Sequence, residues 1–194
     1  MNGEQQALCR ILEESTDVQD DIPWYNREWN QMKLNAYLAA CIALQYQINH
    51  KDREMLARIL RCFCDSESGG VQFDLVRACE AYSDNPYEDE MFVSEVVKAA
   101  PEMLKKSPWC FGSGMFICLL YSQHIKWTYF IQTFKTLNRD EQQVIVDYLT
   151  YREEDENDEE EKEDYQILLV DCLKASGIEK GDSQFFREYF IARQ

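Results

Sequence analysis

Proline, glycine and histidine are scarce in this sequence: its 194 residues include four prolines, seven glycines and two histidines. So little proline and glycine excludes collagen-like and linker-dominated chains, and a hydrophobic share of 45% excludes a wholly disordered chain. A histidine-dependent catalytic site could use only His50 or His124, and neither lies in a recognisable nucleophile motif. The sequence therefore predicts a folded protein that is not an enzyme.

Long apolar runs are absent as well. Runs such as residues 39–44 fall far short of the roughly 20 residues that cross a bilayer, and the first residues lack the pattern of a secretory signal. Of the eight cysteines, Cys41, Cys79, Cys118 and Cys172 lie in apolar patterns with helical spacing, where a reduced thiol packs as a small hydrophobic group. We expect a soluble cytoplasmic protein with free thiols and no contact with membranes.

Basic residues are in the minority. The chain has 20 lysines and arginines against 36 acids, which gives a net charge of −16. Such a chain repels the phosphates of nucleic acid and of anionic lipid, so neither is an expected partner. It attracts basic proteins and speeds their capture. The charge thus favours a basic protein as the partner.

Apolar residues recur with helical spacing along the chain, and no segment alternates convincingly as a strand does. Pro101 predicts a kink or local break within its helix, Ser107 and Pro108 predict a helix start, and Asn138 with Glu141 predicts a capping box. The predicted helices span about 4–15, 29–48, 51–64, 71–82, 88–106, 109–121, 125–134, 138–151, 163–175 and 183–193. We expect residues 1–194 to form a single all-α domain of about nine or ten helices.

Pairs of predicted helices recur every 35 to 40 residues or so, at 51–83, 88–121 and 125–151. This spacing is typical of HEAT-like helix hairpins that stack into an α-solenoid and bury a continuous core. An irregular orthogonal bundle is the competing architecture.

Two short motifs could suggest a cofactor site, but neither has the required spacing. Cys62 and Cys64 lack the two-to-four-residue gap of zinc ligands, and His50 brings no second ligand pair. The glycine-containing segment 111–115 is followed by neither a P-loop lysine nor the third glycine of a dinucleotide site. Its glycines are expected to let two helices approach closely. The sequence predicts no metal and no cofactor.

The densest charge lies at residues 153–164, with ten acids in twelve residues. Repulsion between like charges so close together disfavours a single ordered conformation. We therefore expect residues 153–164 to form an acidic loop between two helices. The loop is either a solvated connection alone or also a docking surface for a basic protein. Its spacing matches no EF-hand calcium loop.

A second acidic cluster, residues 82–90, lies on a turn between two predicted helices and combines two tyrosines with four acids. The acids could simply favour the start of the next helix, or tyrosine and acid together could form a protein-binding patch. A third candidate is the turn at Asp65 and Glu67 with Asp74. The candidate partner-binding residues are therefore Asp65, Glu67, Asp74, Tyr82, Asp84, Tyr87, Glu88, Asp89, Glu90, Glu153, Glu154, Asp155, Glu156, Asp158 and Glu159.

About half of the chain, residues 52–152, resembles a family of bacterial immunity proteins from polymorphic-toxin and contact-dependent growth inhibition systems. The resembling segments are mostly packing residues: 55–65 (MLARILRCFCD), 71–80 (VQFDLVRACE), 92–104 (FVSEVVKAAPEML), 107–109 (SPW), 119–121 (LLY), 130–134 (FIQTF) and 142–146 (QQVIV). The resemblance implies a helical-repeat fold and neutralisation of a cognate toxin by binding. It transfers no catalytic residue.

Charge and resemblance lead to one functional expectation. A nuclease must be positively charged where it holds phosphates, so an acidic helical scaffold is suited to cover it. We expect an immunity protein that forms a 1:1 complex with a basic toxin domain, a nuclease, and blocks its active or substrate-binding site. The alternative is an acidic helical-repeat adaptor or chaperone with other protein partners.

Overall fold

The computed structural model describes residues 3–16, 27–46, 52–65, 71–117, 119, 125–156 and 158–192. Within these ranges every regular element is a helix, and there is no strand. The all-α prediction is confirmed, and so is the expected number of helices. The part of the chain that is described contains no helix long and apolar enough to cross a membrane.

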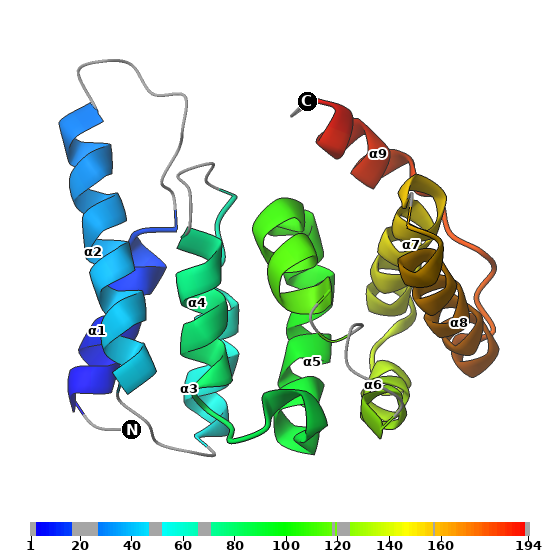
Figure 1. The fold of residues 1–194 in the computed structure, drawn as a ribbon, viewed down its shortest axis with the longest axis horizontal. Helices are drawn as coiled ribbons and strands as arrows, with labels where there is room; N and C mark the ends of the chain where they lie inside the picture. Colours follow the sequence, from blue (N-terminus) through cyan, green and yellow to red (C-terminus); the bar gives the residue numbers. More distant parts are fainter. Residues whose placement is uncertain are drawn as a thin grey trace.

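Figure 1 shows the helices coloured in chain order. In chain order they are α1 (Gly3–Glu14), α2 (Arg27–Tyr46), α3 (Arg53–Leu60), α4 (Val71–Glu80), the 3₁₀ turn η2 (Pro86–Glu88), α5 (Glu90–Lys106), the π-helix η3 (Pro108–Phe116), α6 (Ile125–Phe134), α7 (Arg139–Asp155), α8 (Glu159–Ser176) and α9 (Gln184–Ile191).

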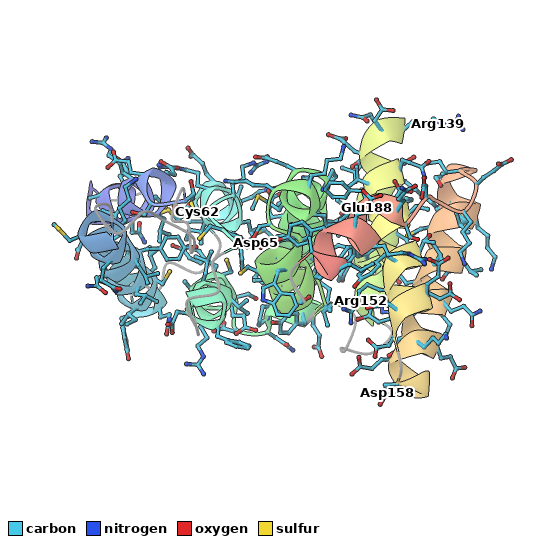
Figure 2. The ribbon with its side chains drawn as sticks, turned by 90° about the horizontal axis from the view of Figure 1, so that it is seen from above. Cys62, Asp65, Arg139, Arg152, Asp158 and Glu188 are labelled. Atoms are coloured by element: carbon cyan, nitrogen blue, oxygen red, sulfur yellow. The ribbon has the colours of Figure 1, made fainter. Side chains whose placement is uncertain are left out.

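The first part of the molecule is a regular stack of helix hairpins. Seen from above, α1, α3 and α5 form one row, and α2, α4 and η3 form a second row beside it (Figure 2). Each helix packs against its hairpin partner and against its neighbours in the row. This part has the arrangement of a solenoid, and the hairpins α3/α4 and α5/η3 correspond to the predicted repeats 51–83 and 88–121.

The last part departs from that regularity. The views of Figures 1 and 2 together show α7 running across the direction of α1 to α5. The third predicted repeat, 125–151, is not a hairpin of the stack, because α7 pairs mainly with α8 while α6 packs against α5 and α8. The solenoid and the crossed bundle each describe one part of this chain.

Helix α5 lies at the centre of the core. Its side chains from Phe92 to Leu104 are largely buried, because neighbours pack on it from α3, η3, α6 and α7. The helix continues through the buried Pro101, so the local break that the sequence predicted there does not occur. Packing on several sides stabilises the helix although proline removes one backbone hydrogen bond.

Two predicted helix starts have different outcomes. The capping box of α7 is confirmed: the Glu141 amide donates to Asn138 Oδ1 at 3.0 Å, and the Asn138 amide donates to Glu141 Oε2 at 2.9 Å. Ser107 does precede η3 with Pro108 at the first position, but its side chain receives no hydrogen bond from the helix. It donates instead to the carboxylate of Asp65, which caps η3 from a distant part of the chain.

Native protein is expected to react slowly with a thiol reagent such as DTNB at about pH 8, because only an accessible thiolate attacks it. The seven described cysteines are all free and buried, and burial raises the pKa of Cys9 to about 11 and that of Cys62 to about 12. Thiol titration in denaturant should therefore count at least seven more reactive thiols than the native protein shows. Release of several thiols by native protein within minutes would contradict this packing.

Candidate protein-binding site

The acidic segment 153–164 is mostly helical. Helix α7 continues to Asp155 and α8 begins at Glu159, so the predicted acidic loop has the wrong boundaries. Asp158 makes the short connection possible: its Oδ1 accepts the Glu161 amide at 3.2 Å, and its backbone carbonyl accepts the Lys162 amide at 2.9 Å. Carboxylates in a first helical turn also interact favourably with the helix dipole, which offsets part of their mutual repulsion.

Three acids of this segment are ion-paired. Lys180 Nζ lies 2.8 Å from Glu153, and the Glu153 side chain keeps only 15% of its surface exposed. Arg187 Nη2 lies 2.8 Å from Glu154, which also accepts the Ser183 hydroxyl. These contacts fix the segment after α8 against the end of α7.

The third pair lies between α7 and α8. Arg152 Nη2 is 2.8 Å from Glu156, and both side chains are mostly buried. The same guanidinium donates to the Tyr165 hydroxyl and lies 5.2 Å from the centre of the Tyr165 ring. Arg152 therefore links α7 to α8, and the charge of Glu156 is largely compensated within the fold.

Other acids of the segment have no cationic partner in the described ranges. Glu161, Glu163 and Asp164 make no ion pair there; Glu163 is exposed, and Glu161 and Asp164 are half-buried. Asp158 is also exposed, and Figure 2 places it at the far end of the α7–α8 pair from Arg139, on the side of the α2–α4–η3 row. We call Asp158, Glu161, Glu163 and Asp164 the acidic end.

A hollow of about 220 Å³ lies between the last turns of α7 and the helix α9. Its walls combine apolar and charged groups: Tyr151, Glu154, Asp155, Arg187, Phe190 and Ile191. The rings of Tyr151 and Phe190 stack with centroids 4.9 Å apart and nearly parallel planes. Burial, followed by the hydrogen bond to Asp155, raises the pKa of the Tyr151 hydroxyl, so it stays a neutral donor at physiological pH. We call this hollow the α9 pocket.

Contacts at both ends hold α9 in place. Arg187 pairs with Glu154 of α7, while the Tyr189 hydroxyl donates to Asp65 and the Phe190 ring lies 6.0 Å from that of Trp109. The last helix thus connects α7 with the start of η3. Sequence reasoning missed the pocket residues of α9, because nothing local to 183–193 indicates that this helix packs back on α7.

The second acidic cluster has mainly a structural role. Tyr82 is buried in the core, where burial raises the pKa of its unpartnered hydroxyl, so it is not the surface anchor that the sequence suggested. Tyr87 donates to Glu80 and packs edge-to-face on Phe92. Asp89 caps α5 by accepting the Met91 amide at 2.8 Å.

Three acids of that cluster are exposed, namely Asp84, Glu88 and Glu90. Glu88 accepts the side-chain amide of Asn85 at 2.6 Å, which holds the turn together. Its one remaining tyrosine, Tyr87, is half-buried and already engaged by Glu80 and Phe92, so the cluster has charge but little apolar surface for a partner. It is a weaker candidate than the acidic end with its pocket.

The third candidate turn is also engaged in the fold. Asp65 receives hydrogen bonds from Ser107 at 2.5 Å and from the Cys110 amide at 2.9 Å, in addition to the one from Tyr189. Asp74 is half-buried in the first turn of α4, and Glu67 lies outside the described residues. Asp65 is therefore a fold-stabilising carboxylate.

No family model, curated protein or solved structure matches the chain. Within the described residues no group of three or more histidines, cysteines and acids could hold a metal ion. The acidic end provides negative charge, and the α9 pocket provides aromatic walls with charged groups among them.

Proposed function

We propose that this protein is an immunity protein that binds a basic toxin domain, a nuclease, through the acidic end and the α9 pocket. Two observations carry the proposal: Glu161, Glu163 and Asp164 have no ion pair within the described residues, and a pocket with aromatic walls lies at the end of α7. A protein interface that is both tight and electrostatically steered requires charge together with an apolar anchor.

The distribution of charge supports the acidic end as the contact surface. On the α1–α3–α5 row, basic side chains are paired with acids, as in Arg53–Glu95 at 2.6 Å, Arg58–Glu13 at 2.8 Å and Arg61–Glu102 at 3.2 Å. These pairs compensate much of the charge on that row. The carboxylates of Glu161, Glu163 and Asp164, which have no ion pair within the described residues, can act on a basic partner over roughly one Debye length, about 8 Å at physiological salt.

The α9 pocket adds an anchor for a lysine or arginine of the partner. The aliphatic stem of such a side chain can lie against Tyr151 and Phe190, with its cationic head near Asp155. The partner's cation would compete with Arg187 for Glu154. A lysine or arginine seated here would be withdrawn from the phosphate-binding surface of the toxin, which is the simplest route to neutralisation.

Affinity capture from the source cell, followed by mass spectrometry, tests the proposal. The expected result is one basic protein, held 1:1 at low and moderate salt, with nanomolar affinity or tighter. The captured protein should degrade nucleic acid when alone and lose that activity with an equimolar amount of this chain. Capture of no basic protein contradicts the proposal, and capture of many unrelated clients favours an adaptor or chaperone.

Removing three charges from the acidic end should slow association with the captured partner roughly tenfold, because exposed charges act mainly on the encounter. The variant is Glu161→Gln, Glu163→Gln, Asp164→Asn. Its dissociation rate should change less than about twofold, and the salt dependence of association should become flatter. Stopped-flow rates at two salt concentrations give both quantities.

A matched control separates local steering from net charge. Glu4, Glu14 and Glu54 are exposed acids on α1 and α3, and replacing all three with glutamine removes the same three charges from the other part of the molecule. The control should retain nearly the association rate of the unaltered protein. Equal slowing by both triple variants would show that the acidic end has no special role.

A further inference from the structure

One long stretch of helix in this highly charged protein carries no charge. Between Leu34 and Tyr46 the helix α2 has no acidic or basic residue, although 29% of the whole chain is charged. Several apolar side chains of α2 are exposed all the same: Met32 at 62%, Ile42 at 48% and Tyr46 at 81%. An exposed apolar surface of this kind is typical of an interaction site.

The exposed residues form one continuous line along α2. Met32, Asn35, Ala39, Ile42 and Tyr46 are all exposed, and they are separated by three and four residues alternately. At about 100° per residue they lie within a sector of about 80°, directly opposite the buried side chains. This alternation is the heptad pattern of a coiled-coil seam, with an alanine at its centre that permits close approach. We call these five residues the α2 stripe.

The neighbours of α2 leave the α2 stripe uncovered. On the buried side Tyr37 donates to the Cys62 carbonyl at 2.7 Å, and on the flank Gln45 donates to the Asp74 carbonyl of α4 at 3.1 Å. The α1/α2 hairpin is the end of the stack in Figure 1. End units of a helical stack usually carry a polar outer face, because no further unit covers them. From Met32 to Tyr46 the outward line of this end has no charge, and Glu28 is the residue that continues the spacing before it.

We propose that the α2 stripe pairs with the same stripe of a second copy of this protein. Two chains of net charge −16 repel each other over most of their surface, and they can meet with least repulsion through a face that has no charge. A basic partner finds no carboxylate on the stripe to bind. A two-fold contact uses the same face on both copies and leaves no uncovered end at the junction.

The size of the α2 stripe sets the expected strength. From Met32 to Tyr46 it is about 21 Å long, and two crossed helices of that length bury on the order of 1,000 Å² in total. This area is at the lower limit for a specific protein interface. The dimer should therefore be reversible, with a dissociation constant in the micromolar range, on the order of 10 µM.

Analytical ultracentrifugation of the purified protein, from about 1 to about 200 µM, tests this inference. The expected result is a monomer–dimer equilibrium that strengthens as salt rises from about 20 to about 300 mM, because salt screens the repulsion between the two acidic chains. Binding of a basic partner at the acidic end should show the opposite dependence on salt. The inference does not rest on the proposed function, and the two can fail separately.

Substitutions locate the contact. Ile42→Glu introduces a carboxylate into the apolar contact on both copies and should weaken dimerisation at least about tenfold. Ile167→Glu on α8 is the matched control, because Ile167 is exposed to a similar degree, 44%, outside the α2 stripe. Ala39→Glu is a second variant on the exposed face, and circular dichroism verifies that each variant is folded.

Three results would overturn the inference. The first is a monomer throughout the concentration range at both salt concentrations. The second is equal weakening by Ile42→Glu and Ile167→Glu. The third is a dimer that dissociates as salt rises, which would indicate a contact made by charges and not by the α2 stripe.

Discussion

Asp65→Asn should lower the free energy of unfolding by about 2 to 3 kcal/mol, because the carboxylate accepts several hydrogen bonds that an amide cannot all accept. One oxygen receives the Ser107 hydroxyl and the Cys110 amide at 2.5 and 2.9 Å. The other receives the Trp109 amide at 3.3 Å and the hydroxyl of Tyr189. Asparagine would replace one of these oxygens by an NH₂ group, which donates hydrogen bonds and cannot accept them. That group would face the N–H and O–H groups that now donate to Asp65.

Urea unfolding monitored by circular dichroism measures the change. Asp140→Asn is the matched control, since Asp140 is an exposed acid in the first turn of α7 and its loss should cost at most about 0.5 kcal/mol. Tyr189→Phe removes only the hydrogen bond from α9 and should cost about 1 kcal/mol. If Asp65→Asn weakened partner binding and left stability unaltered, Asp65 would be a contact residue, as the sequence suggested.

Gly112→Ala is expected to destabilise the protein by about 1 to 3 kcal/mol, because the added methyl group has no space. A Cβ at Gly112 would lie 2.6 Å from the hydroxyl oxygen of Tyr148, which is buried between η3 and α7. Gly114→Ala is the control in the same π-helix, where the Cβ would meet Val76 at an ordinary 3.5 Å. That control should be neutral or slightly stabilising, since alanine favours helix over glycine.

A double-mutant cycle with Tyr148→Phe identifies the cause. Among the described residues the buried Tyr148 hydroxyl has no well-formed hydrogen bond, and only Ser113 interacts with it weakly, so removing the hydroxyl should change stability by at most about 1 kcal/mol. In the Tyr148→Phe background Gly112→Ala should cost at least about 1 kcal/mol less. The rescue should be partial, because the ring carbon Cζ would still lie 2.9 Å from the new Cβ. An equal cost in both backgrounds would exclude this contact as the cause.

Helix positions were predictable from the sequence because they depend on neighbouring residues. The apolar spacing of α5 and the capping box at Asn138 are local signals, and both predicted the structure. The continuous helix through Pro101 was not predictable, since packing from several other helices decides it. Similarly, composition alone did not show that acids of segment 153–164 would continue two helices.

The candidate site was predictable only in part, for the same reason. The charge of the acidic end is visible in the sequence, whereas the α9 pocket exists because α9 packs on α7. The roles of Tyr82 and Asp65 also depend on distant contacts: the partners Asp65 and Tyr189 are 124 residues apart. Residue type indicated a polar surface at both positions. In the fold Tyr82 lies in the core, and Asp65 caps the start of η3.

The attachment of α9 to both α7 and Asp65 has a consequence for cooperativity. A simple stack of hairpins, in which each unit contacts only its neighbours, can melt progressively from either end. Here α9 contacts Asp65, which follows α3 and caps η3, and it also contacts Glu154 of α7. Because these contacts link distant elements, the region from α3 to α9 should open as one unit. Helices α1 and α2 take no part in these contacts of α9. Their amides should be the first to exchange with deuterium, while those between α3 and α9 exchange together and later.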